Sequence, residues 1–164
     1  MMDYEKWIKK VPSELKHDSV WTLQVYRISL YLSEFTWEDI RPIIDGRLYS
    51  LSDQLYRSVG SISANITEGY SRRSYKEQAR FYEIALGSTR ESKDWYFKSR
   101  HILGDKIVNH RIKILTKITK LLLTMIKERR SSHDAREPNV DYTINDINPF
   151  ISDIPIPKSN NVRP

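Results

Sequence analysis

The residues best suited to do chemistry in this chain are its cations, which gather in the second half of the sequence. Residues 74–130 hold 14 Lys and Arg against 6 Asp and Glu, whereas residues 1–47 hold 7 against 8. The whole chain has a net charge of +6 and a pI of about 9.4. A concentrated positive surface favours a polyanionic partner, most often nucleic acid. The alternative is a surface that is basic only for solubility.

One stripe of cations is predicted along residues 106–130. Its members are separated by 4, 3, 4, 3 and 7 positions, so they share one face of a helix that turns about 100° per residue. They are Lys106, His110, Lys113, Lys117, Lys120 and Lys127. Like charges at this spacing destabilise a helix by roughly 0.2–0.5 kcal/mol per pair. We expect a polyanion to offset this repulsion, and a solvated basic face is the alternative.

A second group of cations surrounds the turn before residue 74 and continues along the next helix. Arginine binds phosphate through two parallel hydrogen bonds, and lysine acts as a mobile point charge. The members of this group are Arg72, Arg73, Lys76, Arg80, Arg90 and Lys93. Tyr70 and Tyr75 flank the turn and could stack on unpaired bases. The two groups together predict a phosphate-binding surface.

Short hydrogen-bonding side chains form a polar face of another kind on residues 54–69, and small residues follow on the next helix. Such residues suit a close helix–helix contact in which each polar group finds a partner. This polar seam comprises Arg57, Ser61, Asn65, Glu68, Gly69, Gly87 and Ser88. We predict a contact within the fold or between subunits, and a solvated face and a ligand site are the alternatives.

The sequence offers no set of residues suited to catalysis. Cysteine is absent, which excludes disulfides, thiolate metal sites and cysteine nucleophiles. A di-iron site in a helical bundle needs two Glu-x-x-His pairs, and only Glu14 and His17 have this spacing. Glu83 and Glu91 lie on one predicted helix without a matched acid–base partner. We therefore expect a protein that is not an enzyme and needs no cofactor or metal.

Four helices must position these groups. Apolar residues spaced three and four apart predict helices at about 19–34, 51–68, 74–103 and 106–130. We expect N-caps at Asp18 or Ser19, at Ser50 and at Ser74, and a left-handed C-terminal cap at Gly69. Pro42 and Gly46 favour a loop at about 35–48. The predicted fold is all-α, an antiparallel up-and-down four-helix bundle with an extended, Pro-containing C-terminal tail.

The chain divides into an N-terminal extension at residues 1–18, the bundle at 19–130 and a tail at 131–164. The tail holds five of the seven prolines, so we expect it to be extended and partly disordered. Its segment INPFISDIPIP is apolar enough to dock on its own bundle or on a neighbouring subunit. No apolar run approaches the roughly 18 residues that span a membrane. With no apolar signal-peptide segment at the N-terminus, we expect a soluble, cytoplasmic protein.

Residues 51–74, LSDQLYRSVGSISANITEGYSRRS, resemble the signature of the 23S ribosomal RNA intervening-sequence proteins. A second block, RFYEIALGSTRES, resembles another part of that family's pattern, and the resemblance covers about residues 19–128. Ser58 and Thr67 depart from the pattern, which has alanine there. The matching positions are Gln54, Leu55, Arg57, Ser61, Ile62, Asn65, Ile66, Glu68, Gly69, Phe81, Ala85, Gly87, Ser88 and Glu91.

The resemblance implies a four-helix bundle that assembles as a ring-like homopentamer with a basic surface, and no catalytic activity is established for the family pattern. Such proteins are encoded within insertions in ribosomal RNA genes. They are similar to the accessory variability determinant proteins of diversity-generating retroelements, which bind nucleic acid and a reverse transcriptase. Our leading hypothesis is a non-enzymatic, homo-oligomeric protein that binds RNA or DNA. The alternative is a scaffold that docks a partner such as a reverse transcriptase.

Overall fold

The structure, a computed structural model, describes residues 4–131 together with Pro155 and Pro157. The rest of the predicted tail at 131–164 lies outside the described residues, as do residues 1–3. Over the described part the chain is all-helical and contains no strand. Its elements are α1 (Tyr4–Lys10), α2 (Ser13–His17), the 3₁₀ helix η1 (Ser19–Thr22), α3 (Gln24–Asp45), α4 (Tyr49–Tyr70), α5 (Tyr75–Lys98), α6 (Arg100–Leu103) and α7 (Asp105–Ser131).

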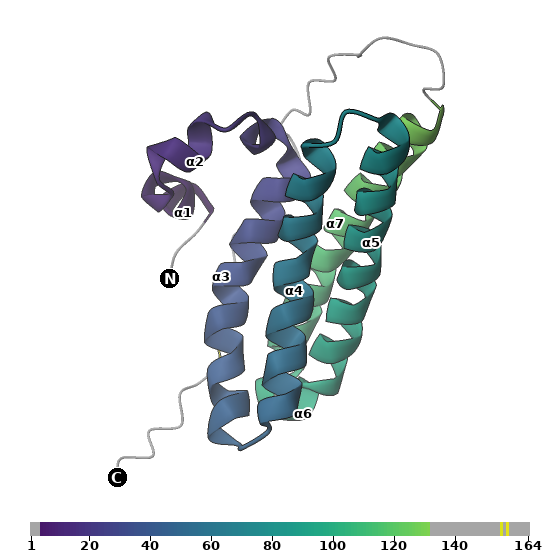
Figure 1. Ribbon diagram of the computed structural model, residues 1–164. Helices are drawn as coiled ribbons and strands as arrows, with labels where there is room; N and C mark the ends of the chain where they lie inside the picture. Colours follow the sequence, from purple (N-terminus) through teal and green to yellow (C-terminus); the bar gives the residue numbers. More distant parts are fainter. Residues whose placement is uncertain (1–3, 132–154, 156, 158–164) are drawn as a thin grey trace.

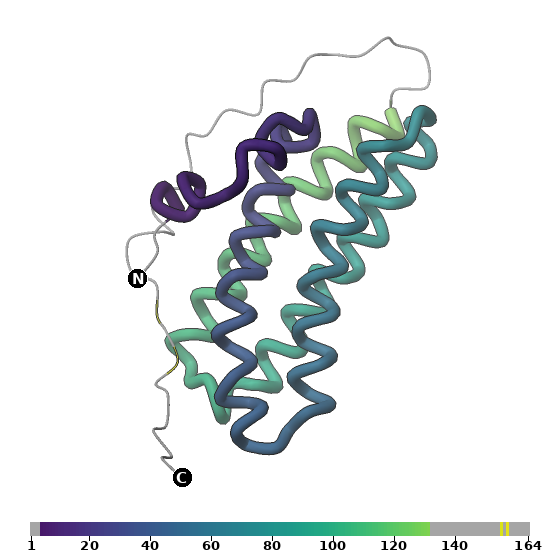
Figure 2. Tube along the Cα trace, turned by 60° about the vertical axis from the view of Figure 1, so that its left-hand side comes forward, coloured from purple at the N-terminus to yellow at the C-terminus, as the bar shows by residue number. Residues whose placement is uncertain are grey.

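The four long helices α3, α4, α5 and α7 lie side by side, and successive ones run in opposite directions (Figure 1). Helix α4 packs closely on α3 and on α5, and α5 packs closely on α7. The contact between α3 and α7 is the thinnest of the four. Figure 2 shows α1 and α2 lying against the first half of α3, where the rings of Tyr4 and Trp7 pack on Tyr31 at centroid distances of 5.1 and 5.2 Å.

The core follows the apolar spacing of the sequence. On α4, Leu55, Val59, Ile62 and Ile66 are at most 1% exposed, which confirms the predicted stripe of that helix. On α7, apolar side chains at positions 3 and 4 residues apart are buried in the same way. Burial of these side chains supplies most of the stability of long helices that are marginal by propensity alone.

The prediction of a loop at 35–48 was wrong, because α3 continues to Asp45 with Pro42 inside it. Pro42 has no backbone N–H and removes one helical hydrogen bond. The buried face nevertheless continues through Phe35, Asp39 and Ile43, the last of which is fully buried. Tertiary packing of this face outweighs the tendency of proline to interrupt a helix. The connection to α4 therefore comprises residues 46–48.

The expected helix ends were correct in part. The side chain of Asp18 accepts a hydrogen bond from the Val20 N–H at 3.0 Å and caps η1. Ser74 makes no side-chain capping bond, and Ser50 lies inside α4, which begins at Tyr49. Gly104 ends α6 with a φ of 79°.

Gly69 lies inside α4 and does not form the expected left-handed cap. A Cβ at this position would lie 2.8 Å from Cε1 of Tyr82 and 3.0 Å from Cβ of Phe81 on α5. The absence of a side chain therefore allows α4 and α5 to approach closely at this turn. The glycine is required by packing and not by its backbone angles.

We expect Gly69→Ala to lower the free energy of unfolding by about 1–3 kcal/mol, because the new methyl group overpacks against the buried Tyr82 ring. Urea denaturation measures this. The matched control is Gly60→Ala on the same helix, where no atom lies within 4 Å of the added Cβ. That substitution should raise stability by roughly 0.5–1 kcal/mol. A gain from both substitutions would contradict this account of Gly69.

Candidate nucleic-acid interface

The face of α7 opposite its core carries exposed lysines at regular spacing. Leu115, Ile118 and Leu122 are fully buried, and the exposed lysines follow on the other side of the helix. Among the described residues, none of these lysines is paired with a carboxylate. They are Lys106, Lys113, Lys120 and Lys127.

Two members of the predicted stripe lie elsewhere on α7. His110 and Lys117 are both half-buried. Nδ1 of His110 lies 2.7 Å from Nη1 of Arg111, and its ring meets the Phe35 ring edge-on at 5.9 Å. The structure therefore separates His110 from the exposed lysines and turns it toward α3.

The cations around α5 also divide into two kinds. Arg72 forms an ion pair with Glu68 and lies over the Phe81 ring at 4.9 Å, so its charge is already engaged. In the part of the chain that the structure describes, the other four exposed cations of this group have no carboxylate partner. These four are Arg73, Lys76, Arg80 and Arg90.

Packing of α5 on α7 brings cations of the two helices to one side of the molecule. The Arg130 guanidinium donates to both carboxylate oxygens of Glu83 at 2.8 Å. Arg90, seven residues after Glu83, lies on the same face of α5. The two helices are antiparallel, so Lys93, ten residues after Glu83, is level with Lys120, ten residues before Arg130. We name Arg90, Lys93, Lys106, Lys113, Lys120 and Lys127 the α5–α7 basic face.

Within this face, Lys93 and Arg90 of α5 interact with each other. Partial burial lowers the pKa of its ammonium group, and the neighbouring Arg90 charge lowers it further. Both effects disfavour the charged form. A phosphate group placed between the two cations would oppose both, because it supplies the missing opposite charge.

Within the described part of the chain, the side chains of the polar seam make no hydrogen bond to another helix. Gly69 does approach α5 closely, as described above. Asn65 is half-buried and donates from Nδ2 to the Ser61 carbonyl of its own helix at 2.7 Å. Ser88 donates to the Ile84 carbonyl of its own helix at 3.1 Å. Gly87 is exposed, with open space where a Cβ would lie.

The remaining two members of the polar seam are exposed. Arg57 pairs with Asp53 at 3.6 Å, and Glu68 pairs with Arg72. A direct polar contact between α4 and α5 is instead the hydrogen bond from Ser92 Oγ to Ser58 Oγ, at 3.1 Å. Apart from the buried Gly69, the seam residues thus lie at least partly at the surface of α4 and α5, where a second copy of the chain could reach them.

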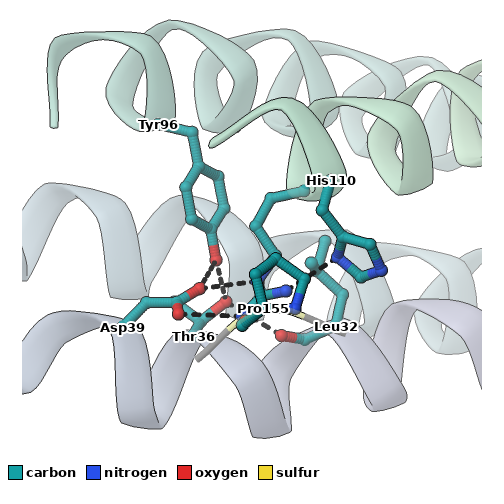
Figure 3. A network of polar contacts seen from close by, with 7 residues as sticks. Leu32, Thr36, Asp39, Tyr96, His110 and Pro155 are labelled. Carbon is teal, nitrogen blue, oxygen red and sulfur yellow. Dashed lines mark hydrogen bonds and ion pairs between the residues drawn. The ribbon is translucent and has the colours of Figure 1, made fainter. Parts of the chain in front are cut away.

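Sequence reasoning missed a buried polar network that joins three helices (Figure 3). Arg111 on α7 donates to both carboxylate oxygens of Asp39 on α3, from Nε at 2.8 Å and from Nη2 at 3.0 Å. The Tyr96 hydroxyl on α5 donates to Asp39 at 3.0 Å and lies 2.8 Å from the Thr36 hydroxyl. Asp39 and Tyr96 are fully buried, and Arg111 is 1% exposed.

Burial dominates the electrostatics of this network. It raises the pKa of Asp39, and the Arg111 guanidinium offsets part of that rise. Burial and the adjacent carboxylate together raise the pKa of Tyr96 well above its ordinary value, so the phenol keeps its proton and donates it. These buried groups bond to one another, so the network joins α3, α5 and α7. The signal for it was Arg111, a cation in phase with the apolar Val108 and Leu115.

An apolar groove lies on the opposite side of the molecule from the basic face. The rings of Trp37 on α3 and Tyr56 on α4 meet at 5.9 Å, and both residues are exposed. The groove has a volume of about 560 Å³. It is lined by Trp7, Lys10, Val11, Pro12, Leu15, Leu30, Ser33, Glu34, Trp37 and Tyr56.

Two further observations concern residues 4–131. No helix in this range is both long enough and apolar enough to cross a membrane. Nor do three or more His, Asp or Glu side chains come together there in a way that could hold a metal ion.

Comparison with known proteins gives one match. The family model of the 23S rRNA-intervening sequence proteins matches residues 22–124, which run from η1 through most of α7. Neither the curated proteins nor the solved structures gave a match.

We expect Asp39→Ala to lower the free energy of unfolding by about 3–5 kcal/mol, because it leaves the Arg111 guanidinium buried without its counter-ion. Urea denaturation measures the change. The double variant Asp39→Leu with Arg111→Met removes both charges and should recover most of the loss. A single variant as stable as the parent protein would show that the pair does not hold the helices together.

Proposed function

Since the chain belongs to the 23S rRNA-intervening sequence protein family, we propose that it binds nucleic acid, RNA or DNA, without catalysing a reaction. We infer that its four long helices form an antiparallel up-and-down four-helix bundle, and that it acts in the cytoplasm as a homo-oligomer. The pentameric ring implied by the family resemblance is our proposal for its assembly. Binding requires no cofactor, because phosphates pair with side-chain cations directly.

The observation that carries this proposal is the set of four exposed lysines on α7 that lack a carboxylate partner in the described structure. A helix selected only for solubility mixes charges of both signs and gains from i,i+4 pairs. The four lysines are seven residues apart, so they repel one another less than an i,i+4 pair would, but no carboxylate of the described residues neutralises them. Arg90 and Lys93 on α5 add further positive charge to the α5–α7 basic face. A polyanion resting on this face would relieve the repulsion.

The geometry of the α5–α7 basic face favours contacts to the phosphate backbone. Lys106 and Lys127 are 21 residues apart on one helix, a distance of roughly 31 Å. This length corresponds to about nine base pairs at 3.4 Å each. Flexible lysines at such intervals bind phosphates without reading base edges, so we propose binding with little sequence preference.

A protein contact is proposed on the other side of the bundle. Exposed Trp37 and Tyr56 and the groove beside them form an apolar surface on α3 and α4. Such a surface suits a protein interface. We propose that a second copy of the chain covers it, which leaves the α5–α7 basic face open to nucleic acid. The alternative function, a scaffold for a partner such as a reverse transcriptase, would use the same apolar surface.

We expect Lys113→Gln, Lys120→Gln and Lys127→Gln together to weaken binding to duplex DNA and to lower the slope of log affinity against log salt. At about 0.9 per phosphate contact the slope should fall by up to about 2.7. Fluorescence anisotropy at several salt concentrations measures both quantities. The charge-matched control, Lys6→Gln, Lys9→Gln and Lys16→Gln on α1 and α2, should change them much less. Equal losses in the two triple variants would show that only the total charge matters.

We expect Trp37→Glu to reduce the number of subunits in the assembly, because it places a charge in the proposed apolar interface. Light scattering coupled to size-exclusion chromatography measures the mass of the particle. The control is Phe97→Glu, which changes another exposed aromatic residue on α5. A parent protein that is already monomeric, or an unchanged mass for Trp37→Glu, would refute an interface at this surface.

A further inference from the structure

The hydrogen bonds of the buried Arg111 guanidinium involve more than the four-helix bundle. Two of its N–H groups bind the Asp39 carboxylate, and Nη1 lies 2.7 Å from Nδ1 of His110. Its Nη2 also donates to the backbone carbonyl of Pro155 at 3.0 Å, across 44 residues of sequence. The guanidinium plane lies over the Phe35 ring at 4.3 Å. A buried donor thus depends on an acceptor from the C-terminal part of the chain.

The Pro155 carbonyl lies on the side of the bundle where the contact between neighbouring long helices is thinnest. Arg111 belongs to α7 and Asp39 to α3, the two long helices with the thinnest mutual contact. The Pro155 carbonyl accepts a hydrogen bond from Arg111, and Figure 3 shows Pro155 in the same network as Asp39. Pro155 and Pro157 are both half-buried, so each of these two residues lies partly against other residues.

We propose that the α3–α7 side of the bundle is a docking site for an extended, proline-containing segment, and that the segment with Pro155 and Pro157 of the same chain occupies it as a strap. The site selects a neutral acceptor, because Asp39 already balances the Arg111 charge and a second carboxylate would be buried without a partner. A backbone carbonyl meets this requirement.

Proline suits such a segment for two reasons. Its ring fixes φ, so less conformational entropy is lost when the chain docks. It also lacks a backbone N–H, so docking against a packed helix leaves no donor unsatisfied at that residue. The alternation Pro155, Ile156, Pro157 places an apolar side chain between two such residues.

The chain is long enough for the strap to come from the same molecule. Arg111 and Ser131 are twenty residues apart on α7, which corresponds to roughly 30 Å. The 23 residues from 132 to 154 can reach about 75 Å when extended, at about 3.3 Å per residue. This length exceeds the distance along α7 more than twofold, so the number of residues is sufficient for Pro155 to reach Arg111 of the same chain.

The chain has no cysteine, so a single introduced cysteine can carry a spin label on the full-length protein. We expect Lys158→Cys, labelled with a nitroxide, to cause loss of NMR peak intensity for the backbone amides of Asp39 and Arg111. The amides of Arg57 and Gly60 on the exposed face of α4 serve as internal controls and should keep their intensity. Unchanged peaks at Asp39 and Arg111 would overturn the proposal.

A mixed sample separates a strap within one molecule from one donated by a second copy. Isotope-labelled protein without the nitroxide is combined with unlabelled protein that carries it. Intensity loss at Asp39 and Arg111 in this mixture would mean that another copy supplies the segment, and it would overturn the assignment within one chain. The double variant Asp39→Leu with Arg111→Met lacks the donor and should show less intensity loss in the single-protein experiment. An undiminished loss of NMR intensity in the double variant would show that Arg111 does not hold the segment in place.

Discussion

The buried ion pair between Asp39 and Arg111 is the interaction on which the arrangement of the helices depends. Taking two charges out of water costs several kcal/mol per ion, and only good geometry with further hydrogen bonds offsets that penalty. Both carboxylate oxygens accept from the guanidinium, and Tyr96 supplies an additional donor from α5. Because these partners come from α3, α5 and α7, a shift of any one helix along its axis would leave a buried charge unpaired. The pair therefore fixes the register of three helices at once.

The two kinds of cation in this protein have different tasks. Eight of the described arginines contact groups of the protein itself, because a planar, rigid guanidinium can bind carboxylates and carbonyls and stack on rings. Those with such contacts are Arg27, Arg41, Arg57, Arg72, Arg100, Arg111, Arg129 and Arg130. The lysines of α7 that face solvent do not take part in such contacts within the described residues. Strongly hydrated, mobile ammonium groups are suited to a ligand whose phosphates have no single fixed position, which is consistent with the proposed binding of nucleic acid.

The chain belongs to the 23S rRNA-intervening sequence protein family, and the matched range includes both kinds of cation. Residues 22–124 include the helices that carry both the Asp39–Arg111 pair and the α5–α7 basic face. Pro155 lies beyond that range, yet its carbonyl completes the hydrogen bonding of Arg111. In our proposals the bundle supplies a basic face on one side and an apolar surface on the other, and the C-terminal segment closes a third side.

The sequence by itself determined the helical class, the buried stripe of α4 and the face of α7 on which the lysines lie. Each of these follows from a periodicity of 3.6 residues, which is local information. It could not show that α3 continues through Pro42, because burial of Ile43 against other helices outweighs the preference of proline. Nor could it show that Gly69 serves packing against Tyr82, that His110 turns away from the lysines, or that Arg111 pairs with Asp39. These features depend on which helices become neighbours, and residues 72 positions apart meet only when the tertiary structure forms.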